Sequence, residues 1–414
     1  MSTNRRQFIN GTVAAGAALG FPAIVRAQSG PIRLGMITVK TGPLASGGLD
    51  MERGLQMQLE ESGNMIAGRK VELIVADSGG VPATARTKMQ ELTEKNKIHA
   101  LIGPLAAFEA LAIDDYIRAH KMPTLGVAAA EDMTQRKASP WFVRPPGSSA
   151  QGTHPMADFC LKQLKWKRAI IMADDIAFGH EQLGGFARVF EEGGGKVVQR
   201  LLPPLTVPDY GSYLAQLKTN ADGIFFGFAG SNGFRFLRQF NEYGLKGKIS
   251  LAGGQASLDE AVLRNMGDEA LGTYTVCPYS AELDNPVNKR VVPAFRAKYK
   301  YDPGWYCMAG HVNGEVFKAA AEAVKGHVED SAALMKALHA VAIPTMRGSV
   351  KIDEYGNVIG DMFIRQVTRK EGRLVNSVVK TYTNVSQFWT YDPKAFLKNP
   401  VYSRDWPPLK NLES

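Results

Sequence analysis

The sequence predicts an α/β protein with two doubly wound parallel-sheet lobes joined by a three-crossover hinge. Three observations support this prediction. Short apolar runs alternate with helical stretches, this alternation restarts before the middle of the chain, and the last third contains helices followed by late strands. Strand–helix alternation with short Gly/Pro loops is typical of a parallel sheet covered by helices. At 414 residues the chain also exceeds the usual size of a single core.

The first unit is predicted to contain four strands with helices between them. Its strands are expected at 32–39, 71–76, 100–103 and 123–127, and its helices at 48–61, 82–95 and 107–119. Thr41-Gly42-Pro43 supplies turn chemistry after the first strand. Pro82 suits the first turn of a helix, because the N–H that proline lacks would have no intrahelical partner there.

A second unit of the same type follows. Its strands are expected at 168–172, 196–201, 223–227 and 249–251, and its helices at 151–164, 181–192, 210–219 and 233–243. The last third contains expected helices at 291–299, 305–325 and 332–340 and strands at 350–353, 362–368 and 375–382. We found no sequence repeat between the two units, so their similarity is one of architecture.

The late elements do not make a third core by themselves, so we expect the chain to return to the first domain and then to the second. The predicted domains are 30–147 plus 279–355 and 148–278 plus 356–385, with a C-terminal extension over 386–414 that lies along the surface. The three crossovers are expected near Gly147, Pro278 and Tyr355. Such a hinge would allow two rigid lobes to close on a ligand.

Residues 1–27 are predicted to be a removable export signal of the twin-arginine type. Arg5-Arg6-Gln7-Phe8-Ile9 precedes an uncharged run from Asn10 to Val25, and small residues flank Arg26 at the expected cleavage site. The alternative of a membrane anchor is disfavoured, because the run has 16 residues where a spanning helix needs roughly 20. The expected location is therefore the periplasm.

The charge of the mature chain argues against a nucleic-acid partner. Cleavage after residue 27 would remove three arginines and no acid, which lowers the formal charge from +9 to +6 over 387 residues. This modest charge supports solubility, whereas nucleic-acid binding needs a clustered basic face. No nucleic acid is expected among the partners.

The three cysteines, Cys160, Cys277 and Cys307, show neither CxxC spacing nor a histidine at zinc-site spacing. In an oxidising compartment one pair could form a disulfide, and Cys277 with Cys307 is the pair that we favour. The alternative, three buried thiols that act as small hydrophobic side chains, stays open.

No catalytic motif is complete. Gly193-Gly194-Gly195-Lys196 lacks the upstream glycine of a phosphate loop, and the GxSxG and GxGxxG motifs are absent. Asp174-Asp175 follows a strand, where loop and cap acids are common, so a metal site there is disfavoured. We therefore expect no cofactor, no metal and no enzymatic activity. An exported α/β hydrolase is the alternative from another class, and it would require a nucleophile, a base and oxyanion donors together.

Several short segments carry a family likeness, and their order and spacing together are specific. They are 32–39 with Thr41-Gly42-Pro43-Leu44-Ala45, Leu101-Ile102-Gly103-Pro104, 123–130, Phe142-Val143-Arg144-Pro145, Phe178-Gly179 and Gly253-Gly254-Gln255. With these segments the chain resembles the periplasmic solute-binding proteins of branched-chain amino-acid ABC importers, the Leu/Ile/Val-binding group. The resemblance covers nearly all of the mature chain. It implies two lobes with three crossovers, no catalysis, and delivery of a solute to a permease in the inner membrane.

In this family, hydroxyls and main-chain N–H groups of the first lobe hold the α-carboxylate of an amino acid, while an acidic residue and a tyrosine of the second lobe hold its ammonium. At the matching positions this chain has Leu105-Ala106-Ala107-Phe108 and Ala128-Ala129-Ala130, without a hydroxyl, then Gly227-Phe228-Ala229-Gly230-Ser231 in the tyrosine region and Gln255 in place of the acid. A buried ammonium without an anionic partner is costly. The resemblance with these changes implies a carboxylate without an ammonium, and the added aromatic rings favour an aromatic acid such as a benzoate or a cinnamate.

The candidate ligand-binding residues are Thr41, Ala106, Ala107, Phe108, Ala128, Ala129, Phe178, His180, Phe228, Ser231 and Gln255. The N–H groups at the start of the helix near Ala107 are expected to hold the ligand carboxylate. The plain alternatives are that Phe108 and Phe178 are ordinary core residues and that His180 faces solvent. Arg144 is expected to order the first crossover and not to touch the ligand.

Two further alternatives concern the role of the protein. One is a receptor for a branched-chain amino acid or an amide, and the other is a sensory module that feeds a receptor, which would have the same fold. The partners that we expect are a small carboxylate ligand and an inner-membrane ABC permease, and we expect the protein to be a monomer.

Overall fold

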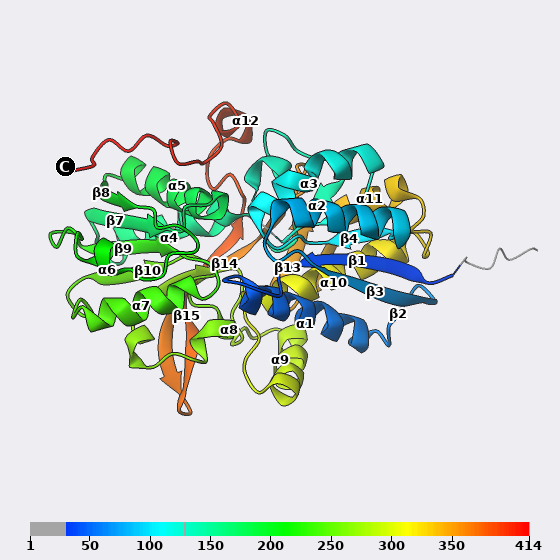
Figure 1. Ribbon diagram of the computed structural model, residues 1–414, viewed down its shortest axis with the longest axis horizontal. Coiled ribbons are helices and arrows are strands. Elements are labelled where there is room, and N and C mark those ends of the chain that lie inside the picture. The colour runs from blue at the N-terminus through cyan, green and yellow to red at the C-terminus, as the bar shows by residue number, and fades with distance from the viewer. Residues whose placement is uncertain (1–29, 128–129, 414) are drawn as a thin grey trace, which may run out of the picture.

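The computed structural model describes residues 30–127 and 130–413 and contains two sheets, each covered by helices (Figure 1). The first sheet has six strands in the order β2-β3-β1-β4-β5-β6. The second has nine, in the order β12-β13-β14-β11-β10-β9-β7-β8 with β15 paired to β14. The predicted α/β class is confirmed. The predicted leader and the candidates Ala128 and Ala129 lie outside the described residues.

The first sheet is parallel except for its edge strand β2. Its strands are β1 (Ile32–Thr38), β2 (Met65–Ile66), β3 (Arg69–Asp77), β4 (Ala100–Ile102), β5 (Thr124–Leu125) and β6 (Phe142–Val143). The helices between them are α1 (Ala45–Glu61), α2 (Pro82–Gln90), the π-helical turn η1 (Glu91–Lys95), α3 (Ala107–His120) and the 3-10 turn η2 (Glu131–Thr134). Strand β1 lies between β3 and β4 and is apolar because helices cover both faces of the sheet.

The second sheet has a parallel core and an antiparallel margin. Its strands are β7 (Arg168–Ala173), β8 (Lys196–Leu201), β9 (Gly223–Gly227), β10 (Ser250–Gly253), β11 (Tyr274–Cys277), β14 (Val358–Lys370) and β15 (Arg373–Val385). Its helices are α4 (Ser149–Lys162), α5 (Ala177–Glu192), α6 (Gly211–Leu214), α7 (Asn232–Glu242), α8 (Glu260–Leu263) and the 3-10 turn η3 (Asp268–Ala270). The sheet is mixed at this margin, where β14 pairs antiparallel with both β11 and β15.

One predicted helix of the second unit is much shorter than expected. The stretch 210–219 forms a helix only over Gly211–Leu214. The Lys218 N–H donates to Gln199 Oε1 at 3.1 Å, so this part of the chain is bound to the neighbouring strand β8 and does not continue the helix.

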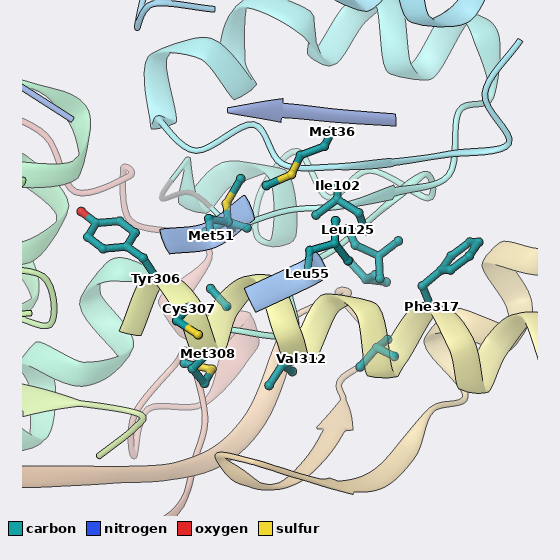
Figure 2. Close-up of a cluster of buried hydrophobic side chains, with 14 of the residues drawn as sticks. Met36, Met51, Leu55, Ile102, Leu125, Tyr306, Cys307, Met308, Val312 and Phe317 are labelled. Carbon is teal, nitrogen blue, oxygen red and sulfur yellow. The ribbon is translucent and has the colours of Figure 1, made fainter. Parts of the chain in front are cut away.

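The returning segment packs against the first sheet before it joins the second. It contains α9 (Pro286–Tyr299), α10 (Trp305–Ala323), α11 (Ser331–His339), β12 (Ala342–Thr345) and β13 (Gly348–Ile352). Helix α10 lies along α1, and the buried side chains between them form the core shown in Figure 2. A Cβ on Gly54 would lie 1.9 Å from the Cys307 carbonyl oxygen, so glycine permits this close approach.

We call the first sheet with α1–α3, α9–α11, β12 and β13 the first lobe, and strands β7–β11, β14 and β15 with α4–α8 the second lobe. The chain passes between them after β6, after β11 and between β13 and β14. Strands β12 and β13 extend the second sheet, since β13 pairs with β14. The residue boundaries of the two domains stay a prediction.

Buried arginines fasten the segments that cross between the lobes. The Arg144 guanidinium is fully buried and donates to Thr134 Oγ1 at 2.9 Å and to the Ala130 carbonyl at 2.7 Å. The Arg144 main chain donates to the Gly356 carbonyl at 2.7 Å. Arg347 donates to the Pro146 carbonyl at 2.8 Å. These hydrogen bonds satisfy charged groups that would otherwise be costly to bury, and they tie the first crossover to the third.

The expected disulfide between Cys277 and Cys307 is wrong. All three cysteines are free and buried. Cys277 and Cys307 pack among the apolar side chains of the core, as the alternative had it. Burial raises the pKa of the Cys277 thiol to about 12, so this group stays protonated.

The C-terminal extension runs over the second lobe and also reaches the first. It is largely irregular, with one short helix, α12 (Pro393–Phe396). Tyr402 is buried and its hydroxyl lies 3.0 Å from His154 Nε2 of α4. Arg136 of the first lobe donates to the Pro400 carbonyl at 2.8 Å. The extension is therefore packed against the body of the protein along much of its length.

His311 gives the α1–α10 contact a pH dependence. The ring is fully buried, with Nε2 3.6 Å from Glu61 and Nδ1 3.3 Å from Glu315. Burial opposes the charge, but the two nearby glutamates outweigh it and raise the pKa of His311 to about 9. Because this pKa lies above the ordinary value, the stabilisation is complete below about pH 6.5 and is lost as the pH rises through about 9.

We expect wild-type protein to lose stability relative to His311→Gln between pH 6.5 and 9.5, by on the order of 3 kcal/mol. Urea denaturation at a series of pH values measures this difference. His327→Gln, at an exposed histidine of the same lobe, is the matched control and should follow the wild type. Parallel profiles for wild type and His311→Gln would contradict a charged His311.

Candidate ligand-binding site

A cavity of about 30 Å³ lies between the two lobes. It is lined by Leu44, Leu105, Ala106, Ala107, Ile176, Phe178, Ala229, Trp305 and Tyr306. Leu44, the 105–107 segment and the Trp305-Tyr306 pair belong to the first lobe, and the other residues belong to the second. Several of them directly follow the carboxyl ends of parallel strands, which is where open α/β sheets bind ligands.

Helix N-termini surround this cavity on several sides. Leu44 precedes α1, Ala106 precedes α3, Ile176 precedes α5, and Trp305 is the first residue of α10. The N-terminus of a helix carries partial positive charge and N–H groups without an intrahelical partner. Four such ends, from both lobes, therefore make the cavity favourable for an anion.

Two aromatic side chains at the start of α10 line the cavity and carry polar atoms. The indole Nε1 of Trp305 is buried and has no hydrogen-bond partner among the described residues. Burial, followed by the charge of Asp259, raises the pKa of Tyr306, so its hydroxyl stays protonated and can donate. The Tyr306 ring points toward the second lobe in Figure 2. A carboxylate in the cavity could therefore accept hydrogen bonds from side chains as well as from the main chain.

No carboxylate and no basic side chain line the cavity among the residues that the structure describes. Gln255 follows β10, and its Oε1 is buried without a hydrogen-bond partner. Gln182 is also buried without partners, and a Cβ on Gly254 would lie 1.7 Å from Gln182 Oε1. Both of these side chains are neutral amides, which cannot compensate the charge of an ammonium.

Three buried acids hold the lining segments from behind. Glu109 accepts from the Ala106 N–H at 3.1 Å, Asp174 from the Ala229 N–H at 2.8 Å, and Asp259 from the Trp305 N–H at 2.5 Å. Burial raises the pKa of Glu109 and raises that of Asp174 to about 7. None of the three lines the cavity. Their shared effect is to fix the main chain around it.

Asp174 and Asp175, weighed as a metal pair, have separate partners. Asp174 also accepts from the Asn232 side chain at 2.6 Å, whereas Asp175 pairs with His180 and Arg404. No group of three His, Cys, Asp or Glu side chains in residues 30–127 and 130–413 is arranged to hold a metal.

The structure brings three of the predicted ligand-binding residues to the cavity wall: Ala106, Ala107 and Phe178. Phe108 is half-buried and packs against the core of the first lobe. The Ser231 main chain donates to the Pro43 carbonyl at 3.3 Å, between the lobes. Gln255 is buried in the same region but does not line the cavity.

Three other predicted residues lie away from the cavity. Thr41 is exposed. The imidazole of His180 lies 2.7 Å from Asp175 and faces the C-terminal extension, because its position on α5 directs it away from the cleft. Phe228 is fully buried in the core of the second lobe, packed edge-on against Tyr210. None of these three side chains lines the cavity in this conformation.

Six lining residues were not predicted: Leu44, Leu105, Ile176, Ala229, Trp305 and Tyr306. Leu44 stands in a segment that carries the family resemblance, and Leu105 and Ala229 stand beside predicted residues in the segments matched to the family's site. A signal for Trp305 and Tyr306 was available, because a helix was predicted to begin at Trp305. Other helices of the chain also begin at the cleft. The sequence does not show that this late helix reaches the cavity.

The two lobes are in direct contact. The Glu131 N–H of the first lobe donates to Glu181 Oε1 of the second at 3.0 Å, and Asp259 of the second lobe accepts from Trp305 of the first.

Two α/β lobes closed around a small cavity are the architecture of a solute-binding protein. The family model described as "Periplasmic binding protein" matches residues 31–373, so the chain belongs to this family. Its class is that of the solute receptors of ABC transporters, which work in the periplasm. Among the residues that the structure describes, no helix is long and apolar enough to cross a membrane.

Known relatives agree with this class. A Leu/Ile/Val-binding protein homologue of Brucella abortus is 27% identical over 363 residues, which cover 85% of this chain and 91% of the relative. An ABC transporter substrate-binding protein from Sphaerobacter thermophilus is 32% identical with a TM-score of 0.81, covering 86% of this chain and 98% of that one. A solute-binding protein from Rhodopseudomonas palustris BisB5, solved in complex with 3,4-dihydroxybenzoic acid, is 28% identical with a TM-score of 0.82 and the same coverage.

Proposed function

We propose that the protein is a periplasmic receptor that binds a small aromatic carboxylate, of the benzoate or cinnamate type, and delivers it to an ABC permease in the inner membrane. One observation carries this proposal: four helix N-termini face the interlobe cavity, and no carboxylate of the described residues does. Such a cavity stabilises a negative charge and offers no partner to an ammonium.

The aromatic character of the ligand is supported by the cavity wall. Phe178, Trp305 and Tyr306 contribute rings from both lobes, and the Trp305 and Tyr306 rings meet at 69° with centroids 4.6 Å apart. Aromatic ligands gain from offset and edge-on contacts with such rings. The relative from Rhodopseudomonas palustris, solved with 3,4-dihydroxybenzoic acid, supports the same ligand class.

The main alternative is a branched-chain amino acid or an amide, which the names of the curated relatives favour. Gln255 argues against an amino acid, because an amide can accept a hydrogen bond from an ammonium but cannot neutralise it. An exported hydrolase is disfavoured by membership of a family of transporter receptors. Export by the twin-arginine route belongs to the proposal as well and rests on residues 1–27 alone.

Thermal shift with matched pairs of compounds tests the ligand class. We expect benzoate, 4-hydroxybenzoate and 3-phenylpropanoate to stabilise the protein. Benzamide, which lacks the charge, and phenylalanine, which adds only an ammonium to 3-phenylpropanoate, should have little effect. A ligand at 100 times its Kd adds roughly 2.7 kcal/mol of stability. Stabilisation by leucine or valine, with none by the aromatic acids, would overturn the proposal.

A further inference from the structure

One carboxyl group joins helix starts of both lobes. Asp259 Oδ1 accepts from the Ala261 N–H of α8 at 3.0 Å, within the second lobe. Its other oxygen, Oδ2, accepts from the Trp305 N–H of α10 at 2.5 Å, across the cleft. The Asp259 side chain is buried. Each oxygen thus satisfies an N–H group that a helix start leaves without an intrahelical partner.

Two other contacts join the second lobe to the loop between α9 and α10. The Arg264 guanidinium lies 3.8 Å from the centroid of the Tyr301 ring. Arg373, at the start of β15, pairs with Asp302 at 2.7 Å. Together with the hydrogen bond between Asp259 and Trp305 they make three contacts across the cleft. We call this set of three the closing contact. The loop between α9 and α10 is thereby held by three side chains of the second lobe.

The hydrogen bond across the cleft depends on a glycine of the first lobe. A Cβ on Gly304 would lie 2.4 Å and 2.6 Å from the two carboxyl oxygens of Asp259. The Gly304 backbone is extended, with φ −108° and ψ −165°, so any residue could adopt it. The absence of a side chain, and not backbone freedom, is therefore what this position requires.

Trp305 links the closing contact to the ligand cavity. Its main-chain N–H binds Asp259, while its side chain and that of Tyr306 line the cavity. Loss of the hydrogen bond would free the first turn of α10, which carries both side chains. When Asp259 lies against the start of α10, the Trp305 and Tyr306 side chains that line the cavity are therefore held in place as well.

We infer that Asp259 is a positioning residue that couples closure of the lobes to formation of the ligand cavity. It binds the N-terminus of α10 when the lobes close and so fixes Trp305 and Tyr306 over the solute. This inference rests on the proposed function, in which the interlobe cavity is the binding site.

The charged neighbours of Asp259 allow this role beside an anionic ligand. Glu260 is held by Arg365 and by the Asn376 amide, and Asp50 is held by Arg53 and Tyr301. Burial, followed by the charges of Glu260 and Asp50, raises the pKa of Asp259 to about 8. The raised pKa shifts this group toward its neutral form, which reduces repulsion of a ligand carboxylate.

Two variants weaken the hydrogen bond between Asp259 and Trp305, one from each lobe. In Asp259→Asn the amide nitrogen has no lone pair for an N–H, so only one of the two helix starts keeps its acceptor. In Gly304→Ala the added methyl displaces the Asp259 carboxyl from the Trp305 N–H. Asp330→Asn is the matched control, because Asp330 caps α11 within the first lobe, where its Oδ1 accepts from Ala333 at 3.0 Å.

Lobe separation is measured by double electron–electron resonance between spin labels at Val81→Cys in the first lobe and Tyr243→Cys in the second. Both positions are about half exposed, and the three native cysteines are buried and do not compete for label. Distances are recorded without ligand and with 4-hydroxybenzoate. Isothermal titration calorimetry with 4-hydroxybenzoate, and thermal melting without ligand, complete the comparison.

We expect the short-distance population to fall in Asp259→Asn and in Gly304→Ala relative to the labelled parent and Asp330→Asn. Affinity for 4-hydroxybenzoate should weaken by roughly 10- to 100-fold, as for loss of a hydrogen bond to an ionisable group. The double variant should bind 4-hydroxybenzoate no more weakly than the single variant of lower affinity, because both changes act on the same hydrogen bond.

Equal distance populations in parent, control and both variants would overturn the inference. So would a lower melting temperature with unchanged distances, which would indicate a structural role only. If the labelled parent binds no aromatic acid, the proposed function is wrong. The spin-label distances measured without ligand then still show whether Asp259 favours the closed form. If Asp259→Asn does not fold, Gly304→Ala alone tests the inference, because it leaves the buried acid in place.

Discussion

Replacement of Arg144 by methionine is expected to lower the free energy of unfolding by about 3–5 kcal/mol, the usual cost of removing one partner from a buried charged network. The guanidinium donates to Thr134 and to the Ala130 carbonyl and lies over the Phe142 ring at 5.3 Å from its centroid. Its charge also acts on the buried acids Glu131 and Glu181. Methionine keeps much of the apolar volume, so the loss reports the missing charge and donors.

The loss of Arg144 is measured by urea denaturation followed by circular dichroism. Arg238→Met is the control, because Arg238 pairs with Glu242 on the surface, where both side chains are more than half exposed. Such surface pairs contribute about 0–1 kcal/mol. A loss below about 1 kcal/mol for Arg144→Met would mean that the crossovers are held chiefly by other contacts, such as those of Arg347.

Replacement of Trp305 by alanine is expected to weaken binding of 4-hydroxybenzoate by about 100- to 1000-fold, as for a central aromatic contact in a buried site. Trp305 contributes both a wall of the cavity and a buried Nε1–H without a partner in the described residues. Trp305→Phe keeps an aromatic face and removes the donor, so its loss should be smaller, roughly 10-fold. Calorimetric titration measures both.

Trp166→Phe is the matched control for the tryptophan variants. Trp166 is a buried tryptophan in the core of the second lobe and does not line the cavity. It should leave the affinity unchanged even where it lowers stability. Equal affinities for wild type and Trp305→Ala would place the ligand elsewhere in the cleft and would contradict the assignment of this cavity.

The regular elements were predictable because their apolar patterns are local. The run 32–39 is mostly apolar because β1 is a central strand with helices on both faces of the sheet. This apolar run was the signal that predicted the strand. The late helices were assigned to the first lobe because a region of helices before strands cannot make a core alone. The helix predicted at 210–219 failed because a tertiary hydrogen bond, from Lys218 to Gln199, overrides local preference.

The site was predictable only where it follows strand ends. Ala106 and Ala107 begin a helix directly after β4, so their place at the cleft follows from the topology. His180 and Phe228 failed to reach the cavity because the direction of one side chain on a helix or loop depends on packing that no local pattern records. Trp305 lies about 200 residues from Ala106 in sequence, and only the packing of α10 on α1 brings them together.

The two ends of the described chain belong to opposite lobes. The Gly30 carbonyl accepts from Arg69 of the first sheet at 3.0 Å, and the Glu413 N–H donates to Val198 of the second at 3.0 Å (Figure 1). Fluorescent proteins fused at these ends would be carried by different rigid bodies. Solute-driven closure would then change the energy transfer between them, which makes the chain a natural scaffold for a genetically encoded sensor of its own ligand.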